Sequence, residues 1–204
     1  MTSRKEIEAK FIVADLDEFR RRLTDSGGYV IAPKHTEQNS YFDTPDRKLR
    51  AAGQLLRLRT DAAVRMTYKC QDGAFEDRTE IELILDDADE ASAILQALGF
   101  KTVLAYEKLR ETFAINGVLV MLDELPFGCF VEIEGASLDR IRQMADSLGL
   151  GWENRVGVGY LALFEAMRDR LGPSLDDMSF ERLHNELLDL IERSTSFTSG
   201  KNKG

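Results

Sequence analysis

The chain has 204 residues and a formal net charge of −9, with 43% hydrophobic and 31% charged residues. A chain of this length is typically a single domain with a sizeable core, and its acidity argues against DNA or RNA as the main partner. A small polyphosphate in a locally basic site is not excluded. The first residues run directly into a charged segment, and the longest apolar run is too short to cross a bilayer. We therefore expect a cytoplasmic protein without a membrane partner.

Charged residues two positions apart mark the strands that the sequence predicts. In a β-strand alternate side chains point to opposite faces, so Glu6 and Glu8 share one face and Ile7 lies on the other. The predicted strands lie around residues 6–10, 37–44, 55–59, 65–70, 78–85, 108–115, 118–123 and 132–134. The Asn116-Gly117 pair predicts a tight hairpin between two of them.

Helix signals follow the glutamate-rich strands. Asp15 is a typical N-cap for a helix to residue 23, residues 87–98 form a second helix that ends at Gly99, and Ser137 caps a third that ends at Gly149. Further helices are predicted over residues 158–171 and 180–191, with a disordered end from residue 194. We divide the chain into a main domain, 1–170, and a C-terminal helical extension with a tail, 171–204.

One face of the predicted strands carries seven acidic and seven basic side chains. The acids are Glu6, Glu8, Glu80, Glu82, Asp123, Glu132 and Glu134, and the bases are Lys10, Arg57, Arg59, Lys69, Arg78, Lys108 and Arg110. The opposite faces are apolar and need helices to cover them. The charged face can then curl inward into a barrel with a polar interior. The alternative is an open antiparallel sheet with a solvated face, but such a face usually includes Thr, Ser and Gln.

These segments, in this order, resemble the CYTH or triphosphate tunnel metalloenzyme superfamily, which includes thiamine triphosphatases, inorganic triphosphatases and class IV adenylyl cyclases. The similarity begins with the Glu-x-Glu-x-Lys motif at residues 6–10 and the Gln-x-x-Tyr-Phe-Asp-Thr motif at residues 38–44. It continues through residues 56–59, 67–69, 78–82, 108–110, a turn at 122–124, and 130–134.

The resemblance implies an α+β fold in which an eight-stranded antiparallel β-barrel forms a tunnel with a charged interior and helices packed outside. It implies a triphosphate held by Lys10, Arg57, Arg59, Lys69, Arg78, Lys108 and Arg110. It also implies Mg²⁺ or Mn²⁺ held by Glu6, Glu8, Glu80, Glu82, Asp123, Glu132 and Glu134. Tyr41 and Lys69 are candidate catalytic residues that position or deprotonate the nucleophile.

We therefore expect a divalent-metal-dependent phosphohydrolase acting on tripolyphosphate, thiamine triphosphate or a nucleoside triphosphate. A class IV adenylyl cyclase, which converts ATP to cyclic AMP and pyrophosphate, is the alternative. The His-Phe pair that often precedes the signature in these cyclases is absent between Met1 and Lys5. A polyphosphate-binding module without turnover fits less well, because it has no use for metal-binding glutamates. The expected partner is the small-molecule substrate, and a homodimer is left open.

Overall fold

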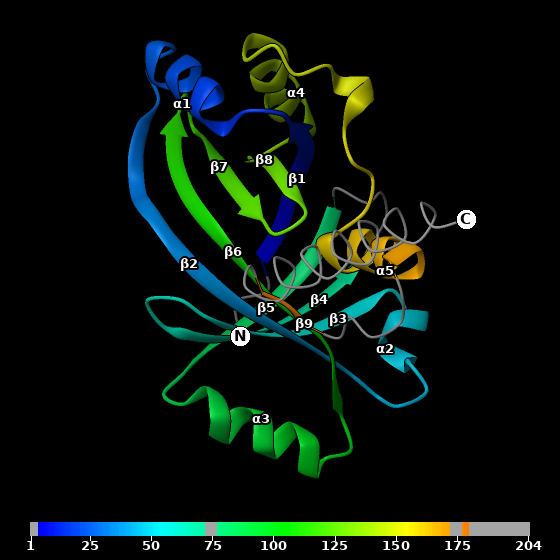
Figure 1. The fold of residues 1–204 in the computed structure, drawn as a ribbon. Helices are drawn as coiled ribbons and strands as arrows, with labels where there is room; N and C mark the ends of the chain where they lie inside the picture. Colours follow the sequence, from blue (N-terminus) through cyan, green and yellow to red (C-terminus); the bar gives the residue numbers. More distant parts are fainter. Residues whose placement is uncertain (1–3, 72–76, 172–176, 180–204) are drawn as a thin grey trace, which may run out of the picture.

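The computed structural model describes residues 4–71, 77–171 and 177–179 (Figure 1). The strands are β1 (Arg4–Val13), β2 (Tyr29–Asp43), β3 (Gln54–Thr60), β4 (Val64–Gln71), β5 (Asp77–Leu85), β6 (Lys101–Ile115), β7 (Val118–Leu125), β8 (Gly128–Glu134) and β9 (Asp177–Met178). The helices are α1 (Leu16–Asp25), α2 (Lys48–Ala51), α3 (Ala88–Ala97), α4 (Leu138–Ser147), the 3₁₀ turn η1 (Trp152–Asn154) and α5 (Tyr160–Leu171).

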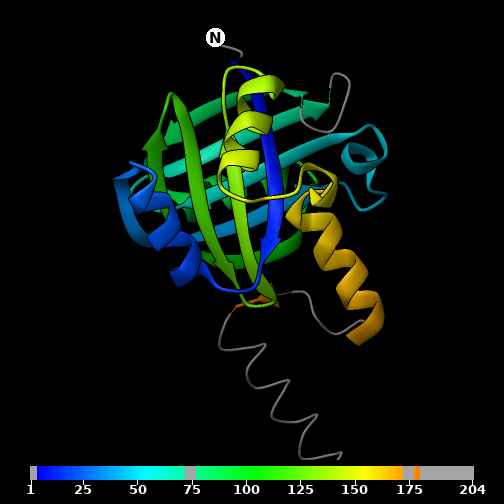
Figure 2. The same ribbon diagram turned by 90° about the horizontal axis from the view of Figure 1, so that it is seen from above.

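Eight of the strands form one antiparallel sheet in the order β2-β3-β4-β5-β1-β8-β7-β6. The sheet is strongly curled, because β2 pairs with β3 through residues 38–42 and with β6 along most of its length. Figure 2 shows β1 and the hairpin strands β7 and β8 in front of the crossing strands β3 and β4. The prediction of an α+β fold with eight antiparallel strands is confirmed. The short β9 adds a parallel pairing to β6 that was not predicted.

Helices cover the outer, apolar face of the sheet. Helices α1 and α4 pack over β1, β7 and β8, where Phe19, Leu23 and Ile141 join a core with strand residues such as Val131 and Ile133. Helix α3 covers a second region, in which Ala91 and Leu95 pack against Phe42 and Leu58. The sheet therefore has its apolar face outward under helices, and its charged face inward.

Local signals set the predicted helix ends and the hairpin. The Asp15 side chain accepts hydrogen bonds from the backbone N–H groups of Asp17 and Glu18, as an N-cap does. Asp87 and Ser137 cap α3 and α4 in the same way. Asn116 and Gly117 have φ angles of 48° and 78°, which are the left-handed values that a tight hairpin turn requires.

Several elements differ from the predictions. β2 begins at Tyr29 rather than 37 and β6 at Lys101 rather than 108. Each extension pairs with the predicted part of the other strand and lacks the alternating charge. The turn predicted at residues 122–124 is wrong: β7 continues to Leu125, and the chain turns at residues 126–127. Helix α2 was not predicted. The predicted helix 180–191 and the tail from residue 194 lie outside the described residues. Within the described part, no helix is long and apolar enough to span a membrane.

Candidate active site

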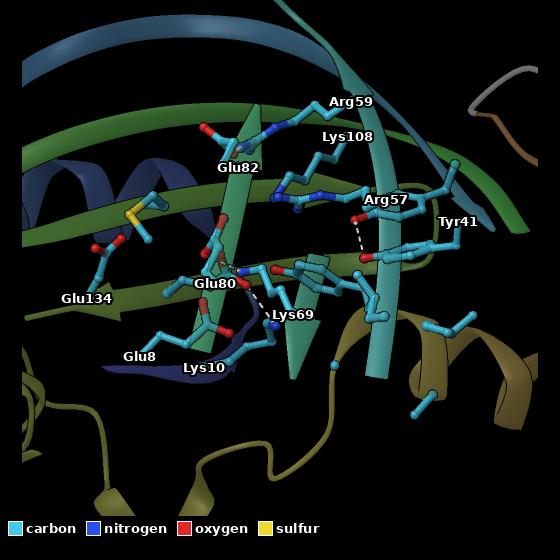
Figure 3. A pocket seen from close by; sticks show the side chains of 18 of the residues that line it. Glu8, Lys10, Tyr41, Arg57, Arg59, Lys69, Glu80, Glu82, Lys108 and Glu134 are labelled. Carbon is cyan, nitrogen blue, oxygen red and sulfur yellow. Dashed lines mark hydrogen bonds and ion pairs between the residues drawn. The ribbon is translucent and has the colours of Figure 1, made fainter. Parts of the chain in front are cut away.

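The inner face of the curled sheet borders a cavity of about 570 Å³ (Figure 3). Twelve of the predicted site residues line it: Glu8, Lys10, Tyr41, Arg57, Arg59, Lys69, Glu80, Glu82, Lys108, Arg110, Glu132 and Glu134. Asp123 lies behind the lining and is fully buried. Glu6 and Arg78 are outside the residues whose side chains the structure describes. The side chains that strand alternation assigned to one face, on seven strands, therefore line one cavity.

Two cations of β6 share one buried carboxylate of β7. Lys108 Nζ lies 2.9 Å from Asp123 Oδ2, and Arg110 Nε donates to Asp123 Oδ1 at 2.6 Å. Arg110 and Asp123 are direct partners in the β6–β7 register. Asp123 therefore fixes where both cationic groups sit at the base of the cavity.

Glu132 of β8 likewise pairs with two cations, Lys10 and Arg110. It faces Lys10 of β1 in the strand register, with Lys10 Nζ 2.7 Å from Glu132 Oε1, and it also pairs with Arg110. Burial raises the pKa of Glu132, but Lys10, Arg110 and Lys108 outweigh burial and hold that pKa well below its usual value. Glu132 is therefore a buried, ionised counter-ion.

Glu37 of β2 is a site residue that was not predicted from the sequence. It is almost fully buried, accepts a hydrogen bond from Arg59 Nη1 at 3.0 Å, and lies 3.3 Å from Lys108 Nζ. Burial raises its pKa, but Lys108, Arg110, Arg59 and Arg57 lower it by a larger amount. Alternation from Tyr41 back through Asn39 puts Glu37 on the inner face, so the signal was present in the sequence.

Arg57 of β3 is a buried cation with no carboxylate at ion-pair distance among the described side chains. Its guanidinium donates to Thr67 Oγ1 at 3.4 Å, and its buried Nε has no hydrogen-bond partner. No described carboxylate lies within ion-pair distance of Arg57. The two glutamates of β5 have other partners: Glu82 accepts a hydrogen bond from Thr67 at 3.1 Å, and Glu80 lies 3.2 Å from Lys69 Nζ. Glu37 and Glu80 act on Arg57 only from beyond that distance, whereas the other described cations of the cavity each have a carboxylate at ion-pair distance.

Three tyrosines form an aromatic wall beside these charges. The rings of Tyr41 and Tyr106 stack with centroids 5.8 Å apart, and their hydroxyls lie 3.4 Å from each other. Tyr160, the first residue of α5, follows with its centroid 6.2 Å from that of Tyr106. Tyr106 and Tyr160 were not predicted as site residues. Tyr106 lies two residues before Lys108 on β6 and so shares its face, which strand alternation could have indicated. Tyr160 lies on a helix, where strand alternation gives no information.

Two carboxylates of the cavity fit a hard divalent cation. Glu8 and Glu134 face each other across the β1–β8 ladder, and both line the cavity. Like charges directly opposite each other destabilise a sheet, and carboxylate oxygens are the ligands that Mg²⁺ and Mn²⁺ prefer. A bound cation between the two strands would relieve that repulsion.

A second acidic group lies at the β2–β3 edge of the site. Among the described side chains, ligand atoms of His35, Glu37 and Asp61 lie within 4.8 Å of one another. Arg59 already lies 3.0 Å from Glu37 and 3.9 Å from Asp61, and Arg65 also pairs with Asp61. These arginines occupy the carboxylates, so this group suits a cation poorly.

A protein-family model described as CYTH domain matches residues 4–146. This chain belongs to the CYTH domain family. The matched region runs from β1 into α4 and carries all the strands of the antiparallel sheet, while α5 and its Tyr160 lie after it.

Two similar proteins are named after an activity. Adenylate cyclase CyaB of Aeromonas hydrophila is 34% identical over 131 residues, which cover 64% of this chain and 68% of that protein. A candidate adenylate cyclase of Methanocaldococcus jannaschii is 26% identical over 171 residues, covering 78% of this chain and 97% of that protein.

Solved structures share the CYTH fold. A candidate adenylate cyclase of Vibrio parahaemolyticus has a TM-score of 0.72 at 22% identity, over 80% of this chain and 99% of its own. A candidate adenylyl cyclase of Hippeastrum, described with a dominant triphosphatase activity, has a TM-score of 0.60 at 17% identity, over 79% of this chain and 96% of its own. At these identities the likeness concerns the fold alone.

Proposed function

We propose that this CYTH protein is a divalent-metal-dependent phosphohydrolase and that its curled sheet acts as a tunnel for a triphosphate. The observation that carries the proposal is Arg57, whose buried guanidinium has no described acidic partner. A buried cation without a counter-ion is costly, and phosphate oxygens are the ligands that an arginine binds best. The substrate is tripolyphosphate, thiamine triphosphate or a nucleoside triphosphate.

The charges of the cavity suit an anion that binds together with a metal. Seven basic and five acidic side chains line the cavity, and the buried Glu37 and Asp123 behind them complete the balance. A triphosphate brings several negative charges into this balanced set. A divalent cation that enters with it compensates the excess. Lys10, Arg57, Arg59, Lys69, Arg78, Lys108 and Arg110 would replace the water around the phosphate oxygens.

Glu8 and Glu134 are the ligands that this geometry supports best for Mg²⁺ or Mn²⁺, with Glu6, Glu80 and Glu82 as further members of the set. When bound, such a metal polarises phosphoryl oxygens. Asp123 and Glu132 hold Lys10, Lys108 and Arg110. Their carboxylates become available to a metal only when these cations turn toward phosphate.

The remaining roles belong to side chains that touch the reacting groups. The lysines and arginines stabilise the charge that develops on the transferring phosphoryl group. Tyr41 and Lys69 both line the cavity and would position the attacking oxygen. Because α5 contributes to the lining after the CYTH match has ended, we propose that the catalytic domain is residues 1–170, followed by an extension over 171–204.

The test is a set of parallel incubations of purified protein with tripolyphosphate, thiamine triphosphate and ATP, each with Mg²⁺, with Mn²⁺ and with a chelator. Products are separated by chromatography. We expect metal-dependent release of orthophosphate from at least one substrate. Absence of turnover despite tight tripolyphosphate binding would contradict the enzyme proposal and leave a polyphosphate-binding module.

A class IV adenylyl cyclase is the second candidate, because a relative that is 34% identical is named adenylate cyclase. In that reaction the 3′-hydroxyl of ATP attacks the α-phosphorus and pyrophosphate leaves. The same incubations distinguish the two, since a cyclase yields cyclic AMP and pyrophosphate in equal amounts and leaves tripolyphosphate intact.

A further inference from the structure

We propose that Tyr160 is a positioning residue that holds the ammonium groups of Lys10 and Lys108 with its neutral ring face, ready for phosphate. The inference rests on the proposed triphosphate-binding function. Tyr160 begins α5, is 5% exposed, and lies beyond the residues that the CYTH model matches. The segment after the matched residues therefore supplies a side chain that contacts cations of the cavity.

Both lysines lie against the aromatic ring. Lys10 Nζ is 3.8 Å from the ring centroid of Tyr160, and Lys108 Nζ is 5.2 Å from it. Both distances are within the range at which a cation is attracted by the electron-rich face of an aromatic ring. The two lysines come from β1 and β6, so one side chain of α5 joins cations from two separate strands.

A neutral partner has a particular advantage at this position. Glu132 and Asp123 already attract these ammonium groups at 2.7 Å and 2.9 Å. A further carboxylate would repel an incoming triphosphate, whereas an aromatic face attracts the ammonium group and adds no net charge. The lysines can therefore be held in place both before and after the anion binds.

The hydroxyl of Tyr160 fixes the orientation of its ring. It donates a hydrogen bond to Asp123 Oδ2 at 2.9 Å, and Asp123 also binds Lys108. Burial, together with Asp123 and Glu132, raises the pKa of the Tyr160 phenol, so that the hydroxyl keeps the proton it donates. Phe130 packs edge-on against the ring, with centroids 5.1 Å apart. The hydrogen bond and the Phe130 contact together fix the ring, and its face meets the cations.

The experiment titrates inorganic tripolyphosphate into the full chain by calorimetry and compares variants at position 160. Tyr160→Leu removes the ring face, and we expect its dissociation constant to rise by about 5- to 30-fold. Steady-state kinetics with the same substrate should show this as a higher KM with little change in kcat. Tyr160→Phe keeps the ring face and should remain within about threefold of wild type.

Fluorinated phenylalanines introduced at position 160 make the test independent of folding. Fluorine withdraws electrons from the ring face at nearly constant shape, so the dissociation constant should rise stepwise with the number of fluorines. The control is Phe164→Leu, a buried position of the same helix outside the cavity lining. It should lower the melting temperature and leave tripolyphosphate binding unchanged.

The outcomes separate the two proposals. If wild-type protein does not bind tripolyphosphate, the proposed function fails and the role of Tyr160 falls with it. If wild type binds but the fluorinated series is flat, the Tyr160 inference alone is overturned. An equal loss in Tyr160→Phe and Tyr160→Leu would also overturn it, because the hydroxyl rather than the ring face would then carry the effect.

Discussion

At the scale of single residues, the facing pair Glu8 and Glu134 is the sharpest test of metal binding. We expect Glu8→Gln to raise the Mg²⁺ concentration needed for half-maximal turnover by at least about tenfold, because it removes one charged oxygen ligand. The measurement is turnover against Mg²⁺ concentration. Glu124→Gln, which changes an exposed glutamate of β7 paired with Lys34, is the control and should behave as wild type. Equal metal requirements in the two variants would contradict the assignment.

Substitution of Arg57 should affect substrate binding much more than the stability of the fold. We expect Arg57→Gln to weaken tripolyphosphate binding by about 10- to 100-fold, since a charge-assisted hydrogen bond is worth roughly 1.5 to 3 kcal/mol. The melting temperature should hardly fall, because among the described residues Arg57 has no acidic partner to lose. Calorimetric titration and thermal melting check the two halves of this expectation. A large loss of stability with unchanged binding would mean that Arg57 is structural.

Glu132 makes stability depend on pH in a defined direction. Its pKa is well below the usual 4.5, because Lys10, Arg110 and Lys108 outweigh the effect of burial. As pH falls below about 4.5 the unfolded chain takes up a proton here while the folded chain does not, so folded-state stability decreases. At pH 7 we expect Glu132→Gln to cost about 3 kcal/mol of unfolding free energy.

The difference between wild type and Glu132→Gln should therefore shrink when urea unfolding is repeated from about pH 6 down to about pH 3. A difference that is constant across this range would show that Glu132 is not the depressed group. At neutral pH the site keeps Glu132 ionised, so its pairing with Lys10 persists where the activity is tested.

At the scale of elements, alternation of charge predicted the strands with one charged and one apolar face. It found the Glu6, Glu8, Lys10 side of β1 and the Arg57, Arg59 side of β3 without knowledge of their neighbours. It failed where a strand has no alternating charge. In the first half of β6, Leu104 and Tyr106 are buried on one face and the residue between them is uncharged, so no alternation marks this segment.

The candidate site was predictable only where it lies on strands. Asp123 and Glu132 follow from alternation, although their roles as buried counter-ions depend on distances between strands that a sequence does not contain. Tyr160 reaches the cavity because α5 folds back beside Lys10 and Lys108. That approach is a tertiary contact, and no local pattern around residues 157–160 indicates it.

The β6–β7 hairpin turn has a glycine at the second of its two left-handed positions. Gly117 has a φ of +78°, a left-handed value that a residue with a Cβ adopts only with strain. We expect Gly117→Ala to lower the unfolding free energy by about 1 kcal/mol. Gly157→Ala is the matched control, because its φ is not in the left-handed range and a Cβ there meets no atom within 4 Å. Urea denaturation compares the two, and equal stabilities would contradict the assignment of strain.

At the scale of the whole molecule, an acidic protein of net charge −9 contains a cavity lined by seven basic side chains. Because the acids within and behind the lining balance these bases, triphosphate and metal should bind with positive coupling. We expect tripolyphosphate to raise the melting temperature more in Mg²⁺ than in a chelator, by a margin larger than Mg²⁺ alone produces. Purely additive shifts would argue against a shared site.

The pairing of strands that are distant in the sequence has a consequence for how the protein is made. β1 pairs with β5 on one edge and with β8 on the other, and β2 meets β6 across all of β3, β4, β5 and α3. During synthesis β1 has an unpaired edge until β8 has emerged, and β2 has one until β6 has emerged. Exposed strand edges attract other chains, and pairings between distant segments form slowly. The nascent chain therefore keeps unpaired edges on β1 and β2 until their late partners β8 and β6 have been made.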